Sequence, residues 1–349
     1  PTPPPPEPPL LPPEPPEPPP PPDPEVPLIR PEIPGYAIAP AVAQQMGIVA
    51  LDRFHVRRGD QALLDTEAGS NVWGRLFGQT SDRGWSAPIS GLDYALDPQF
   101  DGHVAGLQVG IDLLARNHDD GSRDRFGPFF THTTAVGDTI GNTLAIPGNE
   151  SGRLDLHGES LGLSWTRIGP TGWYLDAVAM ATLLHGEAKS DRGIGTDLSG
   201  TVLQSSLEGG YPFRLGDAWT LEPQAQLVGQ YVDLGDADDR FSDIDYEAFG
   251  VLTGRLGLRL EGELALGGMP VQPFLDVNLW RNFASGYDVV FEERTVSMEL
   301  EGTALELGAG LAAKVTEDVS AHGTLRYITG LDGPDSEGFG ANFGIRVKW

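Results

Sequence analysis

Ser160 is the residue whose surroundings most resemble a catalytic motif. It lies in GESLG at 158–162, which fits the G-x-S-x-G pattern of hydrolases with a nucleophilic serine. That chemistry needs a strand, a sharp turn and then a helix, because the turn exposes the serine hydroxyl. The next residues, LSWTRIG at 163–169, instead continue an alternating strand. We therefore predict that Ser160 is not a nucleophile, and a membrane-bound hydrolase stays an alternative that a serine-reactive probe would test.

Other groupings that could bind a cofactor or a metal are equally weak. GAGLAA at 308–313 fits a loose dinucleotide pattern, but no helix is expected after it. The acidic stretch at 236–247 resembles a calcium loop, yet Arg240 and Phe241 stand where an EF-hand needs an acid and then glycine. The seven histidines are scattered and there is no cysteine. The sequence therefore predicts no enzyme, no cofactor and no metal, with a solvated loop at 236–247.

Three arginines are a different kind of candidate, because a helix would have to position them. Residues 40–64 favour a helix in composition, and we predict one from about Ala41 to Arg58 that ends at Gly59. Arg53 and Arg57, four positions apart, would share a face, next to Arg58. Such a helix is ~27 Å long, close to the ~30 Å hydrocarbon core of a bilayer.

The charge balance excludes one class of partner and leaves a membrane open. The 349 residues carry 23 Lys plus Arg against 50 Asp plus Glu, a formal charge of −27. Nucleic acid is not expected as a partner, because phosphate contacts need basic side chains. No apolar run is long enough for a membrane-spanning helix, but a closed β-barrel needs only alternation.

From Asn71 onward apolar and polar residues alternate with a period of two, which is typical of strands. Most of the expected strands are long enough to cross a bilayer at a tilt. The expected spans are 71–79, 101–115, 125–138, 153–168, 171–184, 200–214, 217–233, 249–262, 269–284, 302–314, 318–331 and 337–349. We therefore predict an all-β membrane protein, a 12-stranded antiparallel transmembrane β-barrel with an N-terminal α-helix in the lumen.

The connections and the aromatic residues favour a membrane barrel over a soluble sandwich. Tight turns at 169–172, 215–218 and 315–318 largely alternate with longer polar links, as in outer-membrane barrels. The long links are expected at 80–100, 139–152, 185–199, 234–248 and 285–301. Aromatic residues near the strand ends would form an interfacial girdle. They are Trp73, Trp165, Trp173, Trp219, Tyr231, Trp280, Tyr327 and Trp349.

The last strand carries the sharpest local pattern. Phe343, Ile345, Val347 and Trp349 alternate with small or polar residues up to the final position. We predict that these four side chains are a C-terminal assembly signal, recognised when the strand adds to an open sheet edge. An ordinary amphipathic edge strand is the alternative.

Taken together, the segments resemble the translocator domain of autotransporters, the type V secretion family, with a pertactin-like proline-rich lead. The resemblance rests on VWGRLFG at 72–78, FDGHVAGLQVGIDLL at 100–114, SLGLSWTRIG at 160–169, LEPQAQLVGQYVDL at 221–234 and FGIRVKW at 343–349. It implies a barrel in the outer membrane of a Gram-negative bacterium that anchors and helps export an N-terminal passenger. Implied partners are outer-membrane lipid, the passenger, the barrel assembly machinery and periplasmic chaperones, with the chain as a monomer.

Domain boundaries follow from composition. Residues 1–34 hold 20 of the 31 prolines and are expected to form a solvated proline-rich linker. Residues 35–66 would be the lumen helix segment and 67–349 the barrel. The chain begins with proline, so we expect it to be a piece of a longer one. No asparagine precedes Asn71, which departs from self-cleaving relatives and predicts no asparagine-based cleavage within 1–70.

A helix inside the lumen would need partners for Arg53, Arg57 and Arg58, because poorly solvated charges are costly when unpaired. The alternation places both acids and bases on the polar face of the strands. The expected lumen wall residues are Arg75, Asp112, Asp176, Glu208, Glu222, Arg255, Arg259, Glu261, Asp276, Glu306 and Arg326. Two further alternatives stay open at this point: a porin-like channel of the outer membrane and a soluble, acidic β-sandwich binding module.

Overall fold

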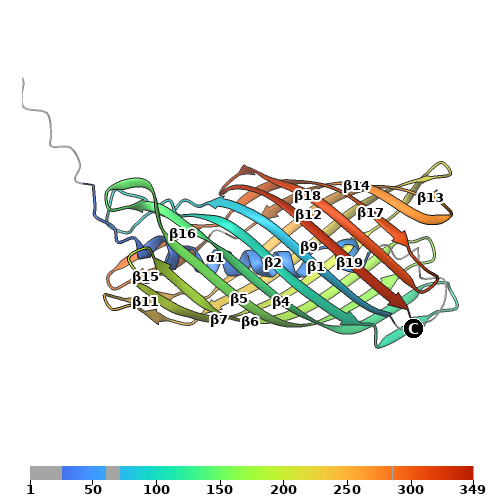
Figure 1. Ribbon diagram of the computed structural model, residues 1–349, viewed down its shortest axis with the longest axis horizontal. Helices are drawn as coiled ribbons and strands as arrows, with labels where there is room; N and C mark the ends of the chain where they lie inside the picture. The colour runs from blue at the N-terminus through green and yellow to red at the C-terminus, as the bar shows by residue number, and fades with distance from the viewer. Residues whose placement is uncertain (1–25, 60–70, 285, 349) are drawn as a thin grey trace, which may run out of the picture.

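The computed structural model describes residues 26–59, 71–284 and 286–348. Within these ranges, twelve long antiparallel strands form one sheet, and it closes because β1 pairs with both β2 and β19. Figure 1 shows the strands winding steeply around one long barrel with α1 inside. The predicted 12-stranded barrel is confirmed, and the soluble sandwich is wrong.

The long strands follow one another around the barrel in sequence order, so every connection joins neighbours. They are β1 (Asn71–Gly84), β2 (Gln99–Ile111), β4 (Arg123–Thr143), β5 (Ile146–Ile168), β6 (Tyr174–Ser190), β7 (Gly195–Gly210), β9 (Trp219–Leu234), β12 (Phe249–Gly262), β14 (Met269–Asn282), β17 (Gly302–Lys314), β18 (Val319–Asp332) and β19 (Asp335–Lys348). Three short strands extend hairpins at the C-terminal end of the barrel: β3 (Leu114–Asn117), β8 (Phe213–Leu215) and β13 (Leu264–Leu266).

Two of the expected long links are strand instead. β4 and β5 continue through 139–152 and reverse at Leu144 and Ala145, both with positive φ. Likewise, β6 and β7 pair through most of 185–199. Polar outward side chains such as Asn142, Glu187 and Lys189 interrupt the hydropathy alternation there, although the backbone ladder goes on. A strand that outlasts the apolar band is therefore read from sequence as a loop.

The alternation orients most side chains as expected. Outward-facing leucines such as Leu161 and Leu325 are about 70% exposed to the surroundings of the barrel. Trp219 and Tyr231 also face outward, as a girdle requires. Trp73 is an error of that prediction, because it is buried in the lumen, where its ring leaves room for no side chain at Gly110. Trp280 likewise faces the lumen, and the Arg255 guanidinium carbon lies 5.7 Å from the centre of its ring.

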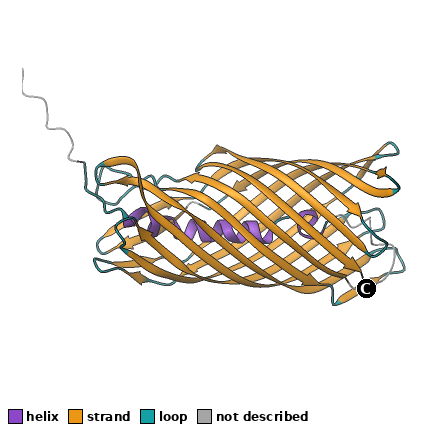
Figure 2. Ribbon diagram, viewed as in Figure 1, coloured by secondary structure: helices purple, strands orange, loops and turns teal. Residues whose placement is uncertain are grey.

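The lumen helix is longer than expected and is broken. It consists of α1 (Glu32–Leu51) and α2 (Phe54–Arg58), so the prediction of one helix over 41–58 is wrong at its start and in its middle. Figure 2 shows both helices inside the barrel. The break is at Asp52, whose positive φ ends α1. Within the described residues, neither helix is long and apolar enough to span a membrane.

Pro40 explains the misplaced start. A proline inside a helix removes one N–H and leaves the carbonyl four residues earlier without its donor. That carbonyl belongs to Tyr36, and it accepts a hydrogen bond from the Tyr246 hydroxyl instead (3.2 Å). The Tyr287 hydroxyl donates to the Ala37 carbonyl (2.7 Å) and accepts from the Ala41 N–H (3.2 Å). Two tyrosines from distant strands therefore replace the helix bonds that the proline disrupts.

These tyrosines come from a second, four-stranded sheet at the end of the barrel where α1 begins. It consists of β10 (Ala237–Asp238), β11 (Asp243–Tyr246), β15 (Gly286–Phe291) and β16 (Arg294–Glu299). Figure 1 shows this sheet around the start of α1, at the opposite end from the C-terminus. The sheet uses the expected links at 234–248 and 285–301, which are therefore built structure and not open loops.

Asp239 in the acidic stretch is a structural residue of this second sheet. It accepts hydrogen bonds from the Phe241 and Ser242 amides (2.8 and 2.9 Å) and an ion pair from Arg30 (2.9 Å). Burial alone would raise the pKa of Asp239, but the two amides and the Arg30 guanidinium outweigh it and lower that pKa. Residues 26–31 are thus fastened to the rim just before α1 enters the lumen.

Candidate functional site

The lumen is the candidate functional site, and neutral amides line its middle. α1 lies against β2, β4, β5, β6, β7 and β9. Glutamines of the wall reach the helix backbone: Gln230 donates to the Gln44 carbonyl (3.0 Å) and Gln204 to the Gly47 carbonyl (3.0 Å). On another side, Gln45 donates to the Ser81 hydroxyl (2.9 Å). These contacts hold α1 in the lumen without burying charge.

Asp52 is the centre of a charged cluster at the break between the helices. One carboxylate oxygen of Asp52 lies 3.0 Å from Arg75 of β1 and 3.0 Å from Arg326 of β18. Arg75 also donates to the Ala50 carbonyl (2.5 Å) at the end of α1. A cation at a helix C-terminus satisfies orphan carbonyls and complements the helix dipole. The break is therefore fixed by two strands that adjoin β19 on either side.

The three predicted helix arginines each meet a carboxylate of the wall. Arg53 contacts Asp276 (2.6 Å) and Glu306 (2.9 Å). The other two arginines are on α2, where Arg57 contacts Asp176 (2.6 Å) and Arg58 contacts Asp112. All three guanidinium groups are almost fully buried.

The remaining predicted wall residues also face the lumen and form smaller groups. Arg255 contacts Glu208 (2.9 Å), whose other oxygen accepts the Phe54 N–H at the start of α2 (2.9 Å). Glu222 contacts His55 (2.8 Å). Arg259 contacts Glu261 (2.8 Å), which is only half-buried near the rim. The structure therefore brings all the predicted wall residues into the lumen, distributed over several clusters along α2 and the break.

Sequence reasoning missed Asp52 and His55, although both make contacts as close as those of the arginines. Asp52 directly precedes Arg53 inside a stretch expected to be continuous helix, so nothing marked it as a break. An aspartate is among the few residues that tolerate a positive φ, which is the only local signal it carried. His55 has no second histidine at a metal-ligand spacing, so no motif singled it out.

The helix does not fill the lumen evenly. Because α1 lies against β2 to β9, a cavity of about 140 Å³ remains toward β14, β17, β18 and β19. Gln45, Asp52 and Glu306 are among its lining residues. Helix α1 thus fills one side of the lumen, and a narrow cavity remains on the other side.

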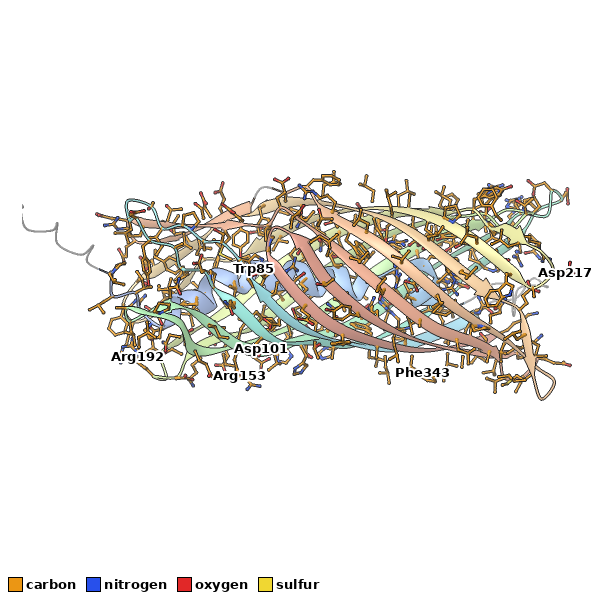
Figure 3. All side chains as sticks on the ribbon, turned by 90° about the horizontal axis from the view of Figure 1, so that it is seen from above. Trp85, Asp101, Arg153, Arg192, Asp217 and Phe343 are labelled. Atoms are coloured by element: carbon orange, nitrogen blue, oxygen red, sulfur yellow. The ribbon has the colours of Figure 1, made fainter. Side chains whose placement is uncertain are left out.

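Ser160 and the C-terminal strand are the remaining candidate positions from the sequence. Ser160 lies within β5, and its hydroxyl is 2.8 Å from that of Thr182 on the neighbouring strand, so the turn that a nucleophile needs is not there. Phe343, Ile345 and Val347 face outward from β19, as Figure 3 shows for Phe343. Trp349 lies outside the described residues. Within the described residues, no group of acidic or histidine side chains could hold a metal.

Comparison with known proteins identifies the family. Residues 72–326 match the family described as "Autotransporter beta-domain", so the chain belongs to that family. It is 30% identical over 283 residues to the pertactin autotransporter of Bordetella bronchiseptica, covering 78% of this chain and 28% of that protein. It is 26% identical over 363 residues to the adhesin BmaC autotransporter of Brucella suis, covering 93% and 10%. The chain thus spans less than a third of these curated relatives.

Solved structures agree on the fold. The transport unit of the autotransporter AIDA-I from Escherichia coli matches with a TM-score of 0.67 at 16% identity, covering 92% of this chain and 99% of that one. The translocator domain of NalP from Neisseria meningitidis matches with a TM-score of 0.60 at 14% identity, covering 90% and 98%. The chain is therefore an outer-membrane β-barrel of the translocator type, located in the outer membrane of a Gram-negative bacterium.

Replacing Asp52 by Asn tests the charged cluster. The change leaves Arg75 and Arg326 without their shared counter-charge, and breaking a buried pair costs about 3–5 kcal/mol. We expect a clearly lower melting temperature of the detergent-purified barrel, measured by heat-dependent gel mobility. Asp217→Asn, in an exposed turn, is the matched control and should change nothing.

A second change in the same cluster separates charge from shape. Adding Arg326→Gln to Asp52→Asn removes one of the two stranded cations, so the melting temperature should recover in part. A double variant no more stable than Asp52→Asn alone would show that the lumen water screens these charges and that the cluster does not hold the helix.

Proposed function

We propose that the chain exports an N-terminal passenger across the outer membrane and then anchors it at the cell surface. The observation that supports this best is the direction of α1. The helix starts at the rim opposite the C-terminal end and descends through the lumen toward β1, which starts at the C-terminal end. A passenger preceding residue 32 would therefore leave at the α1 rim while the barrel stays in the membrane.

The rim with the second sheet is then the extracellular side, and the end with the tight turns is the periplasmic side. Short periplasmic turns are the rule in outer-membrane barrels. The proposed division of the chain is a proline-rich linker over 1–34, a lumen segment over 35–66 and the barrel over 67–349, with α1 already beginning at Glu32. The linker would separate the passenger from the extracellular rim.

In this proposal the helix charges Arg53, Arg57 and Arg58 hold the lumen segment in place after export. Their partners come from β6, β14 and β17 and from Asp112, which directly follows β2. Pairs spread around the wall fix both the depth and the rotation of the helix. The translocator itself carries out no bond chemistry in this proposal.

The proposed assembly partners are the barrel assembly machinery and periplasmic chaperones, acting on a monomer. β19 is the strand that closes the barrel, because it pairs with β18 on one side and with β1 on the other. An unpaired strand edge in lipid costs several kcal/mol for each unsatisfied group, so β19 must be held until closure. The proposed recognition surface is the outward row of Phe343, Ile345 and Val347, together with the final residue Trp349 of the sequence.

Export is tested by fusing a small epitope-tagged passenger before residue 1 of the chain and expressing it with a signal sequence in a Gram-negative host. We expect whole cells to bind the antibody and added protease to release the tag. The same fusion to a chain that ends at residue 334, before β19, is the control for barrel-dependent display. A tag that is accessible only after cell lysis, although the barrel is in the outer membrane, would contradict export.

Replacing Trp349 by Asp tests the assembly signal separately. We expect several-fold less barrel in the outer-membrane fraction and more degradation, because a charge replaces the last apolar group of the recognition row. Lys348→Gln, next to it, should be mild. Equal membrane levels for Trp349→Asp and the wild type at matched expression would mean that this position is ordinary strand edge.

A further inference from the structure

Three histidines from three adjacent strands meet on the outer wall of the barrel. They are His132 of β4, His157 of β5 and His185 of β6. The ring centroids of His132 and His157 are 6.3 Å apart, and those of His157 and His185 are 5.2 Å apart, with planes within about 20°. They are some 25 residues apart in sequence, so only strand pairing brings them together.

Two carboxylates hold this row of imidazoles. Glu159 lies 3.1 Å from Nδ1 of His132 and 3.3 Å from Nδ1 of His185, and Asp155 lies 3.2 Å from Nε2 of His157. Each imidazole therefore keeps its other ring nitrogen for a further partner. All five side chains are between a third and two thirds exposed. We call these five residues the histidine patch.

The histidine patch lies where the apolar band of the outer wall ends. On β5 the outward side chains change from Leu163 and Leu161 to Glu159, and on β6 they change from Leu183 to His185. On β4 the change is from Phe130 to His132. Asp101 and Arg153, farther toward the extracellular rim, also belong to the polar zone (Figure 3). The patch is therefore at the depth of lipid headgroups in the outer leaflet.

A groove in the apolar band adjoins the patch on β5 and runs across the neighbouring strands to β12. Its rims are large apolar side chains of β5, β7, β9 and β12, and its outward floor is made of small residues. The rim residues are Leu161, Leu163, Leu203, Tyr231 and Leu252, and the floor residues are Ala179, Ala181, Ser205, Gly229 and Gly250. Leu161 pairs with Ala181, so the groove begins one outward position from Glu159. An extended chain of methylenes could lie in it.

We propose that this wall binds a phosphorylated lipid of the outer leaflet, with its phosphate at the histidine patch and an acyl chain in the groove. The continuity of the two features favours one amphiphilic occupant over two separate ones. Doubly protonated imidazoles donate from both ring nitrogens, so each can serve a carboxylate and a phosphate oxygen at once. A resident metal is not favoured, since no described cluster has metal-ligand geometry.

Charge makes this binding dependent on pH. With neutral imidazoles the two carboxylates give the patch a charge of −2, and with three imidazoliums the charge becomes +1. The charged and titratable neighbours on the same wall are Asp101 and His103 of β2, Asp138 of β4, Arg153 of β5, Glu187 and Lys189 of β6 and Asp197 of β7. With His103 neutral they add −2, so phosphate is repelled at high pH. Affinity for the phosphorylated lipid should therefore be higher in acid, where imidazoles can carry positive charge, than in alkali.

The experiment measures retention of lipid by the full chain purified in detergent. Bisphosphorylated lipid A and its dephosphorylated form are added at about pH 5.5 and about pH 8, and retained lipid is quantified by mass spectrometry. The variants are the triple change His132→Gln, His157→Gln and His185→Gln, and the groove-filling Ala181→Trp. His103→Gln is the matched control, an outward histidine on β2 that is not a member of the histidine patch. Heat-dependent gel mobility checks that each barrel is folded.

We expect the wild type to retain the phosphorylated form better at the lower pH, and the triple variant to lose about tenfold in that preference. Ala181→Trp should reduce retention of both lipids at both pH values, and His103→Gln should match the wild type. Equal preference in the triple variant and the wild type would overturn the proposal. So would inhibition by free pyrophosphate without any lipid retention, or an Ala181→Trp effect confined to self-association of barrels.

Discussion

The structure depends on one constraint: charges inside a narrow lumen must find partners there. Asp52 shows it most directly, since it ends α1 and is shared by Arg75 and Arg326. Removing Asp52 would leave two buried cations that water can reach only in part. This cluster fixes the helix break against β1 and β18, and Asp52 and Arg326 line the remaining lumen space.

The ion pairs between the lumen segment and the wall explain why the helix adopts one position better than they explain the stability of the barrel. Buried ion pairs contribute little net free energy, because desolvation offsets attraction, but a misplaced partner is costly. The wall carries bases as well as acids, so a helix shifted by one turn would set like charges together. The glutamine contacts, such as that of Gln230 with the Gln44 carbonyl, discriminate less sharply against such a shift. The charges therefore select one position for a plug that the neutral contacts then stabilise.

The period-two alternation was enough to predict the strands and their two faces, but strand length, the alternation of short and long connections and the placement of aromatic residues were needed to predict a membrane barrel. The period-two alternation was also enough to place Arg255 and Asp276 on the lumen side. It failed where distant groups decide the outcome. Pro40 stands in a helix only because hydroxyls of the second sheet replace its lost bonds, and Trp73 faces inward because Gly110 leaves space for it. The histidine patch arises from strand register, which the sequence does not display.

The most direct test of the plugged lumen is single-channel conductance in planar bilayers. The full chain is compared with a chain lacking residues 32–58 and with one in which Arg53, Arg57 and Arg58 are all glutamate. The account predicts small, steady conductance for the full chain, several-fold larger conductance for the deletion, and frequent openings for the charge reversal, because the helix is then repelled by the acidic wall. Indistinguishable conductance in all three would contradict the claim that paired charges hold the helix in the lumen.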